Sequence, residues 1–451
     1  MQPAHPIDPP SAKDKHKRQR KNWSDKDRQM TVLIAGGGIS GLALALSCHQ
    51  VGIPFQVFEA ASQMRPLGVG INLQPSAVRE LFDLGLEGRL DEVGLPLKDY
   101  GLYTKRGLHV WTEARGLDAG YDWPAYSVHR GRLHMLLYEE LIRRAGPDAV
   151  QTGWRATGFD NRAATATLHL ETRAGETRSV TGDVLIGADG IHSAIRRQMQ
   201  PLEDEPQWGG AMLWRGITQA KPFLSGASMA LIGHDGLRFV TYPISAPDPD
   251  TGLAAINWIC NLQFDPAESF RKEDYSRAAN IDDFLPAFEQ IRFDWLDAPA
   301  LIRGAHKVFE YPMVDRDPLD SWTVGRTTLM GDAAHAAYPV GSNGAGAGIT
   351  DARKLVAAFL AHGLTSDALL AYEAEMLPVT SKIILTNRTA GPDKILDVVE
   401  QRCGGQFDRI EDVIPHAEMA EHAATYKRIA GFGIEETNAR PPIIPSGARF
   451  G

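Results

Sequence analysis

The sequence predicts an α/β protein in which a parallel-sheet domain, discontinuous along the chain, is interleaved with an antiparallel-sheet domain and followed by a helical C-terminal segment. Three short aliphatic runs, at 31–35, 183–188 and 327–330, each lead into a glycine turn and a helical pattern of apolar residues. Such strands are typical of parallel sheets covered by helices. Between the second and third runs lie longer segments of alternating polarity, which are typical of antiparallel strands with one covered face.

The composition is that of an ordinary globular protein. A chain of 451 residues, 43% of them hydrophobic, has room for two or three domains and an enclosed pocket. No apolar run approaches the roughly 18 residues of a membrane span, so we expect no membrane partner. The net charge of -9 argues against nucleic acid as a partner. Cys48, Cys260 and Cys403 form no CxxC pair, so we expect reduced thiols and a cytoplasmic protein.

Residues 1–29 differ from the rest of the chain. They combine four prolines with a cluster of Lys and Arg and contain almost no aliphatic residues, so we predict a disordered basic tail. They offer no apolar stretch suited to a secretory signal. A nuclear-targeting or nucleic-acid-binding arm is the alternative interpretation. Met30 directly precedes the first strand, so a functional chain that starts at Met30 is also open.

The first glycine turn has the pattern of a Rossmann-like dinucleotide-binding motif. In this motif one glycine allows the tight turn, a second lets the backbone approach a pyrophosphate, and a third lets the helix pack on the strand. The predicted binding residues of the turn are Gly36, Gly38, Ile39, Ser40 and Gly41. Glu59 ends a second strand about 20 residues further on, where a carboxylate can accept from a ribose hydroxyl. The motif does not separate NAD from FAD, but an acid at Glu59 disfavours a 2'-phosphate.

The second glycine turn, Asp189-Gly190, follows the strand at 183–188 and precedes a helix with Arg196 one turn in. Taken alone, this segment fits a structural corner between a strand and a helix better than a binding site. Its weight comes from the other two motifs. Three strand ends, each with glycine and with an acid or a helix start, indicate one extended ligand, contacted at its adenosine, its pyrophosphate and its ring.

The third turn, Gly331-Asp332, is followed by a glycine-rich helix start. Glycines within a helix cost up to about 1 kcal/mol each relative to alanine, so a purely structural helix would rarely carry so many. Bare backbone lets a flat ring lie on the turn, with N–H groups facing a developing negative charge. We therefore predict a flavin-binding segment; a flexible glycine loop is the alternative. Its expected binding residues are Gly331, Asp332, Gly341, Asn343, Gly344 and Ala345.

These motifs together carry a family resemblance over about residues 31–390. The sequence resembles the FAD-dependent aromatic monooxygenases of the p-hydroxybenzoate hydroxylase type (group A), most closely the phenazine (5-methylphenazine-1-carboxylate) monooxygenase branch. Besides the three glycine turns and Glu59, the matching segments are Arg65 to Asn72, Ser127-Val128-His129-Arg130, Trp214-Arg215-Gly216 and Tyr311 to Arg316.

The resemblance implies roles for single residues. It places Arg130 on the flavin diphosphate, Asp189 on the pyrophosphate and the pyridine nucleotide, and Asp332 on the ribityl or ribose hydroxyls. Arg65 and Gly70 are also expected to bind the cofactor. The sequence contains no HExxH, CxxC or GxSxG motif, so we expect no metal site and no side-chain nucleophile.

We expect the cofactor, and no side chain of the protein, to carry out the chemical steps. We expect NAD(P)H to reduce FAD, O2 to form a flavin C4a-hydroperoxide, and one oxygen to be transferred to an aromatic or N-heteroaromatic small molecule. The protein would hold the substrate and exclude water. A dehydrogenase or halogenase on the same fold, and a non-catalytic flavin-binding sensor, are the alternatives; the sequence has no WxWxIP segment of the halogenases.

The substrate is expected on the antiparallel sheet, whose predicted strands are 211–218, 237–244, 254–264 and 306–314. A single aromatic residue there is more often part of a core than of a ligand wall, but the resembling enzymes use this sheet as the pocket floor. The predicted pocket residues are Trp214, Tyr242, Tyr311 and Pro339. His335 is expected to have a local hydrogen-bonding role, with catalysis as the alternative.

The domain boundaries follow from these assignments. We expect the FAD-binding domain at 31–75, 100–205 and 320–389, and the substrate domain at 76–99 and 206–319. Residues 390–451 have helical apolar spacing, and both a pocket lid and a homodimer contact are open as their use.

Overall fold

The computed structural model describes residues 31–265, 279–389, 391, 393–431 and 433–451, except for the side chains of 426–430. The predicted tail at 1–29 and the alternative start at Met30 lie outside these residues. Within the described residues, none of the helices combines the length and the hydropathy that crossing a bilayer requires.

A six-stranded sheet forms the centre of the first domain. Its strands are parallel except for the short edge strand β20, and they come from all three predicted segments of this domain. In sheet order the strands are β20 (Thr323–Val324), β21 (Thr327–Leu329), β12 (Val184–Gly187), β1 (Val32–Ala35), β2 (Phe55–Glu59) and β8 (Val150–Thr152). The predicted fold class is confirmed, because aliphatic runs far apart in the sequence lie beside one another in this sheet.

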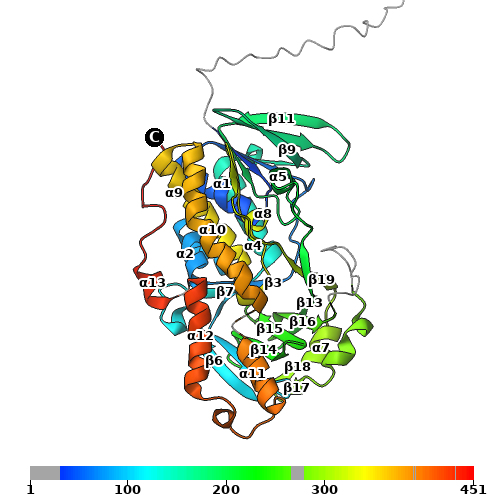
Figure 1. Cartoon of the computed structure of the whole chain (residues 1–451). Coiled ribbons are helices and arrows are strands. Elements are labelled where there is room, and N and C mark those ends of the chain that lie inside the picture. Colours follow the sequence, from blue (N-terminus) through cyan, green and yellow to red (C-terminus); the bar gives the residue numbers. More distant parts are fainter. Residues whose placement is uncertain (1–30, 266–278, 390, 392, 432) are drawn as a thin grey trace, which may run out of the picture.

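Helices cover the parallel sheet, and their apolar side chains join those of the strands in one large core. Figure 1 shows α9 and α10 side by side along this domain, with α10 extending down toward the large sheet of the second domain. The helices of this domain are α1 (Ile39–Val51), α2 (Pro75–Asp83), α3 (Glu87–Leu90), α4 (Arg130–Ala145), α5 (Ala194–Met199), α8 (Asp332–His335), α9 (Gly344–His362) and α10 (Ser366–Thr389).

Two small antiparallel sheets complete this domain. One is made of β9 (Arg155–Asn161), β10 (Ala166–Glu171) and β11 (Thr177–Gly182). The other, in the order β3 (Gly70–Leu73), β7 (Ala125–His129) and β4 (Gly94–Leu97), lies next to the second domain. Strand β3 of this small sheet therefore brings the expected cofactor residue Gly70 to the domain junction.

The second domain is a seven-stranded, mainly antiparallel sheet. Its strands in order are β19 (Val308–Asp315), β13 (Gln207–Ala220), β16 (Ala254–Gln263), β15 (Leu237–Pro243), β14 (Ser228–His234), β5 (Asp99–Tyr103) and β6 (His109–Ala114). One face packs on α6 (Leu285–Phe288), α7 (Ala298–Arg303) and the hairpin of β17 (Arg292–Phe293) and β18 (Leu296–Asp297). The four predicted strands of this sheet are present; β14, β5 and β6 are additional.

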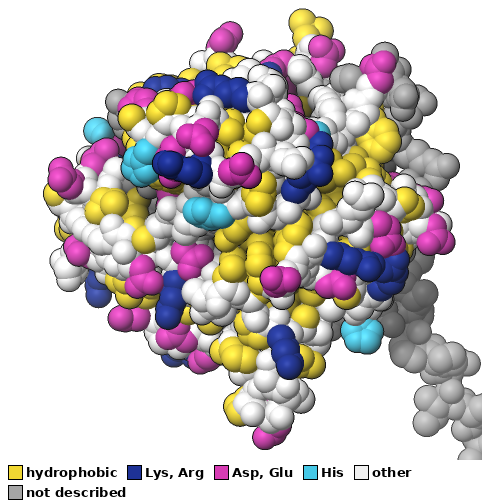
Figure 2. Space-filling model, turned by 90° about the horizontal axis from the view of Figure 1, so that it is seen from below, with side chains coloured by type: hydrophobic (Ala, Val, Ile, Leu, Met, Phe, Trp, Pro, Cys, Tyr) yellow, Lys and Arg dark blue, Asp and Glu magenta, His cyan; other side chains and the backbone are white. Residues whose placement is uncertain are grey.

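The C-terminal segment is helical, with α11 (Lys394–Cys403), α12 (His416–Ala430) and α13 (Ile434–Ala439). α11 packs on the face of the seven-stranded sheet opposite to α6 and α7. Figure 2 shows the lower side of the molecule, where hydrophobic side chains gather in the middle and basic and acidic side chains are interspersed around them. This side of the protein is therefore neither strongly basic nor strongly acidic.

Two segments lie elsewhere than the expected domain division placed them. β5 and β6, expected within the FAD-binding part that begins at residue 100, belong to the seven-stranded sheet, because β5 pairs in parallel with β14. Leu81 and Leu90, within 76–99, are buried in the core of the first domain and not in the substrate domain. Both differences arise from contacts between segments distant in sequence, which local residue patterns do not reveal.

Candidate active site

The three glycine turns meet at one edge of the parallel sheet. β1, β12 and β21 are neighbours and run in the same direction, so the turns after Ala35, Gly187 and Leu329 lie at the same end. Glu59 ends the adjacent strand β2 and joins them there. The carboxyl edge of a parallel sheet is the usual place for a nucleotide in this kind of fold.

The first turn is packed against its neighbours and open toward solvent at one residue. A side chain on Gly36 would overlap the carbonyl of Ala188, and one on Gly41 would overlap the carbonyl of Gly36. A Cβ on Gly38 would meet no protein atom within 4 Å. Gly36 and Gly41 thus serve the turn itself, whereas Gly38 leaves space above the start of α1, where N–H groups suit a phosphate.

Two side chains hold Gly37 from either side. Glu59 Oε2 accepts from the Gly37 amide at 2.7 Å, while its Oε1 accepts from the Ala61 amide at 2.7 Å. His134 Nε2 donates to the Gly37 carbonyl at 2.6 Å. Burial lowers the pKa of His134, so the neutral ring that donates through Nε2 is favoured. Glu59 is fixed in place with lone pairs left for a hydroxyl group, and His134 is a supporting residue that the sequence analysis missed.

Asp189 caps the helix of its own motif. Its Oδ1 accepts from Ser193 Oγ at 2.5 Å and its Oδ2 from the Ala194 amide at 2.8 Å. Burial raises the pKa of Asp189 although these hydrogen bonds oppose the shift. The adjacent Gly190 has a φ of 80° and would present a Cβ to open space. Both oxygens of the Asp189 carboxylate are therefore used in hydrogen bonds within the turn, and the free space lies next to it, above the backbone of Gly190.

Arg196 connects the second turn with the third. Its guanidinium donates to the carbonyls of Ala333 and Ala334 at 3.1 and 2.9 Å, and its other side pairs with Glu203. It is almost completely buried. The four-residue helix α8, which begins at Asp332, is thus held by a residue of the Asp189 motif.

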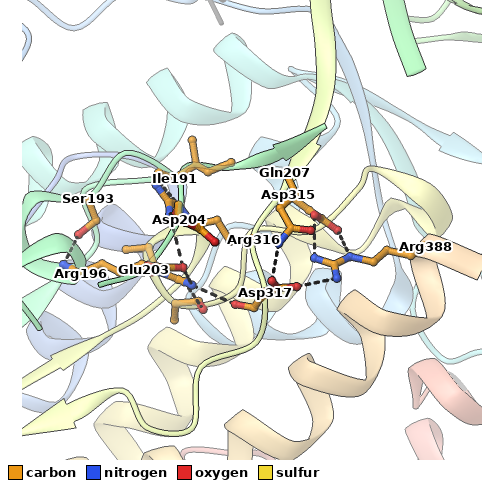
Figure 3. A network of polar contacts seen from close by, with 12 residues as sticks. Ile191, Ser193, Arg196, Glu203, Asp204, Gln207, Asp315, Arg316, Asp317 and Arg388 are labelled. Atoms are coloured by element: carbon orange, nitrogen blue, oxygen red, sulfur yellow. Dashed lines mark hydrogen bonds and ion pairs between the residues drawn. The ribbon is translucent and has the colours of Figure 1, made fainter. Parts of the chain in front are cut away.

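The same network continues to α10 (Figure 3). Arg316 donates to the Ile191 carbonyl at 2.7 Å, and Arg388 of α10 pairs with Asp315 at 2.7 Å and with Asp317 at 2.7 Å. Charge-assisted pairs with two contacts are among the stronger polar interactions. The loop after β19 is therefore fixed between the second turn and α10.

The third turn is held by a buried carboxylate of α9. Asp351 Oδ2 accepts from the Gly331 amide at 2.8 Å and pairs with His335 Nε2 at 2.6 Å. Gly331 has a φ of 57°, and a Cβ there would meet Ser40 Oγ at 2.5 Å. Burial alone would lower the pKa of His335, but Asp351 and Asp332 raise it above its ordinary value. His335 thus has the expected local hydrogen bond, while the Asp332 side chain is exposed at the sheet edge.

The glycine-rich segment forms a strained loop before α9. Gly341 and Ser342 have φ values of 71° and 60°, in the left-handed region that few side chains favour. Asn387 Nδ2 of α10 donates to the carbonyls of Tyr338 and Val340 at 3.0 and 3.1 Å, which fixes the loop from outside. The predicted residues follow at the start of α9, with Asn343 buried, Gly344 exposed and Ala345 partly buried.

Gly70 joins the first domain to the seven-stranded sheet. Its amide donates to Asn257 Oδ1 at 2.7 Å and its carbonyl accepts from Arg215 at 2.7 Å. A Cβ on Gly70 would meet Asn257 Cγ at 2.6 Å. The other residues of this group, Arg65 and Arg130, are exposed at the neighbouring surface. Arg130 is the first residue of α4, and its amide donates to the Val69 carbonyl at 2.9 Å.

The sheet face that meets Gly70 carries Arg215, Tyr242 and Tyr311. Because side chains alternate along a strand, Arg215 of β13 shares its face with Ile259, its partner on β16, and with Phe309, its partner on β19. Burial raises the pKa of Tyr242 to about 12 although the Arg215 guanidinium opposes the shift. Burial also raises the pKa of Tyr311. Both phenols are therefore neutral hydrogen-bonding groups at neutral pH.

Trp214 lies on the opposite face and is a correction to the predicted pocket. It stacks on Phe284 with ring centroids 4.8 Å apart and belongs to the core beneath α6 and α7. The physical reason is alternation along β13, which sends adjacent residues to opposite faces. Pro339 is exposed in the loop before Gly341, so it lies next to the predicted flavin segment.

Sequence reasoning missed Arg215 and Asn257 as site residues, along with Asp351. Arg215 stands in the Trp214-Arg215-Gly216 segment, of which only Trp214 was predicted to line the pocket. The alternation of side chains along β13 could have indicated Arg215. If Trp214 lies in the core, Arg215 lies on the opposite face, and a cation there needs a polar partner. For Asn257 and Asp351 we see no signal in the local sequence.

Comparisons with known proteins agree with this geometry. The FAD binding domain family matches residues 29–386. The chain is 41% identical to phenazine 1,6-dicarboxylic acid hydroxylase PhzS of Lysobacter antibioticus over 364 residues, or 80% of this chain and 89% of that protein. The chain belongs to the FAD-dependent aromatic monooxygenases of the p-hydroxybenzoate hydroxylase type.

Two further proteins are similar to this monooxygenase. It is 30% identical to salicylate hydroxylase of Pseudomonas putida, with 72% of this chain and 75% of that protein covered. The structure of Klebsiella pneumoniae HpxO complexed with FAD and uric acid has a TM-score of 0.69 at 24% identity and covers 93% of this chain and 100% of its own. The latter similarity shows a common fold.

FAD is the cofactor of this monooxygenase, and the site fits it. The open positions at Gly38, Gly190 and Gly344 lie along the edge where the three turns meet, so bare backbone is presented where a long cofactor would lie. Among the described residues, His, Cys, Asp and Glu side chains form no group of three or more that could hold a metal ion. The contacts of single residues with FAD stay predictions, of which Gly38, Glu59 and Asp332 have the best-placed groups.

Proposed function

We propose that this monooxygenase hydroxylates an N-heteroaromatic carboxylic acid of the phenazine class, with NAD(P)H as the reductant and O2 as the oxidant. FAD-dependent hydroxylation of an aromatic compound is the activity of the family; the substrate class, the reductant and the oxidant are our proposal. Bound FAD would accept electrons from NAD(P)H and deliver one oxygen atom of O2 to the substrate. The name of the relative at 41% identity favours this activity over a dehydrogenase, a halogenase or a sensor.

The observation that carries the substrate class is the environment of Arg215. Its guanidinium donates to the Gly70 carbonyl, but no acidic side chain of the described residues pairs with it, and its Nε is buried without a hydrogen-bond partner among them. Arg215 is partly buried, and a cation withdrawn from water is costly unless it is paired. A substrate carboxylate would supply the missing charge, and a guanidinium can bind it with two parallel hydrogen bonds.

The residues around Arg215 suit a flat, polar ring system. Ile259 and Phe309, its cross-strand partners, offer apolar surface. Asn257 Nδ2 is buried and has no hydrogen-bond partner among the described residues, so it can donate to a ring nitrogen or a carboxylate. These groups would hold the ring against the floor and keep water away during oxygen transfer.

The test compares phenazine-1-carboxylic acid with unsubstituted phenazine on the FAD-loaded protein. We expect coupled NAD(P)H oxidation and a hydroxylated product only with the acid. Arg215→Gln should raise the KM for the acid about 30-fold, since loss of one partner of a buried charge pair costs 2 kcal/mol or more. Arg155→Gln, which removes an exposed ion pair with Glu171, is the matched control and should change nothing. Equal turnover of both compounds by the wild type would contradict the proposed role of the carboxylate.

Two further expectations belong to this proposal. A cytoplasmic location is supported by the free thiols of Cys48, Cys260 and Cys403 and by the cellular supply of NAD(P)H. A homodimer stays a prediction, and sedimentation velocity at several concentrations tests it directly.

A further inference from the structure

The C-terminal helix α11 lies on the same sheet face as the proposed substrate residues. Its buried side chains pack against Leu231 of β14, and Val240 of β15 packs against the same cluster. Leu231 and Val240 are cross-strand partners, and Tyr242 is two residues beyond Val240 on the same face. α11 therefore covers the part of the face that adjoins Tyr242.

One arginine of the sheet anchors the start of this helix. Arg238 of β15 pairs with Asp393 at 2.9 Å and with Asp397 at 3.3 Å, and all three side chains are largely buried. Asp397 also accepts from the Asp235 amide at 2.6 Å and pairs with Lys394 at 3.1 Å. Without Arg238, the carboxylates of Asp393, Asp397 and Asp235 would face one another with only the partly exposed Lys394 to balance them.

The chain before α11 lies against the loop assigned to the flavin. Asn387 donates to the carbonyls of Tyr338 and Val340, as described above. A Cβ on Gly391 would meet Val340 Cγ1 at 2.6 Å. Gly391 thus lies at the flavin loop, while Asp393, two residues further on, is paired with Arg238 of the substrate sheet.

A row of cross-strand partners connects Arg238 with the proposed pocket residue Tyr311. Arg238 is the cross-strand partner of Asn261, Asn261 is the partner of Leu213, and Leu213 is the partner of Tyr311. Asn261 Oδ1 is buried and has no hydrogen-bond partner among the described residues. The row from Arg238 to Tyr311 therefore contains a buried acceptor between the anchored helix and a proposed pocket residue.

We propose that α11 is a wall of the substrate pocket, on the sheet face that adjoins Tyr242, and that Arg238 is the residue that positions it. This inference rests on the proposed function, because it assigns the wall to the same pocket. The matched family region ends at residue 386, so the wall comes from a part of the chain that the family model does not describe. In this role α11 limits which substrates fit the pocket and keeps water out of it. The C-terminal segment therefore contributes to the choice of substrate.

The experiment uses the FAD-loaded full chain with Arg238→Gln, and with Arg402→Gln as the matched control. Arg402 pairs with Glu418 at 2.7 Å and joins α11 to α12 away from the sheet. In Arg238→Gln we expect the KM for phenazine-1-carboxylic acid to rise about tenfold, in the range that misplacement of site groups costs. A larger fraction of NAD(P)H electrons should end in H2O2, while FAD content stays at the wild-type level. Arg402→Gln should behave as the wild type.

Hydrogen exchange provides a readout that needs no substrate. Amides of 394–403, and those of Tyr338, Val340 and Gly341, should exchange faster in Arg238→Gln than in Arg402→Gln. Unchanged exchange of these amides would contradict the anchoring role of Arg238. Faster exchange with an unchanged KM and an unchanged H2O2 fraction would contradict the proposal that α11 forms a wall of the substrate pocket. If Arg238→Gln does not fold, the same measurements on Asp397→Asn decide, with a smaller change in the same direction expected. Failure of the wild type to hydroxylate the acid is a different result: it would contradict the proposed substrate, and exchange together with H2O2 release in the absence of substrate would still decide the role of Arg238.

Discussion

Asn257 of the seven-stranded sheet accepts a hydrogen bond from the Gly70 amide at 2.7 Å, and the two domains meet at this bond. Gly70 has no room for a side chain because Asn257 occupies the space. Gly70 therefore links the cofactor domain to the substrate floor through both of its backbone groups, its amide bonded to Asn257 and its carbonyl to Arg215.

Gly70→Ala should therefore loosen the junction of the domains. Inserting a methyl group into a tightly packed position costs about 1–3 kcal/mol, so we expect a lower Tm and a larger H2O2 fraction during turnover. Gly88→Ala is the control, because a Cβ there meets no atom within 4 Å and the site is helical. Thermal denaturation of both variants measures the difference, and equal Tm values would contradict the tight contact.

Gly38 and Gly41 have separate roles that substitution can distinguish. Gly38→Ala leaves the protein atoms undisturbed and should keep the Tm of the apoprotein, while its methyl group enters the space proposed for the pyrophosphate. We expect at least a tenfold higher Kd for FAD, equivalent to about 1.4 kcal/mol. Gly41→Ala collides with the Gly36 carbonyl and should lower the Tm itself. FAD titration and melting of the apoproteins separate the two effects; wild-type FAD affinity in Gly38→Ala would remove the pyrophosphate from this turn.

Asp332 is exposed at the start of α8, where a carboxylate can accept from cofactor hydroxyls. Asp332→Ala should lower FAD retention strongly, because a charge-assisted hydrogen bond contributes about 1.5–3 kcal/mol. Asp367→Ala, at another exposed helix start, serves as the control. The ratio of flavin to protein absorbance after gel filtration measures retention. Full flavin occupancy in Asp332→Ala would be incompatible with its assigned contact.

The pair of His335 and Asp351 makes stability depend on pH in a defined direction. Asp351 raises the pKa of His335 against the effect of burial, so the protonated ring stabilises the folded state. This contribution is complete below the unfolded-state pKa of about 6.5 and is lost as pH rises through the higher folded-state pKa. Tm should therefore fall over this range in the wild type and less steeply in His335→Gln. His49→Gln, on an exposed ring, should keep the wild-type slope; a parallel slope in His335→Gln would contradict the charged pair.

The cofactor edge could be predicted from the sequence because its signals are local. A strand, a glycine turn and a helix start stand within a few residues of one another, so the turns at Gly36, Asp189 and Gly331 were predictable one at a time. Their meeting at one edge followed from the parallel arrangement. Asp351, which holds Gly331, was not predictable, since its role depends on how α9 packs behind the turn.

The substrate side was predicted less well for a physical reason. Neighbouring residues of a strand point to opposite faces, so Trp214 and Arg215 exchange roles if the covered face is misjudged. That face was decided by α6 and Phe284, which lie far along the chain. The parallel pairing of β5 with β14 is likewise a contact between distant segments, and it displaced the expected domain boundary.

The most direct test of the central claim is the fate of molecular oxygen. FAD-loaded protein, NAD(P)H and phenazine-1-carboxylic acid would react under ¹⁸O2, with the product analysed by mass spectrometry and H2O2 counted separately. We expect a product that carries one ¹⁸O atom, in an amount close to that of the NAD(P)H consumed. NAD(P)H oxidation that yields only H2O2 and no labelled product, with this acid and with other N-heteroaromatic acids, would contradict it.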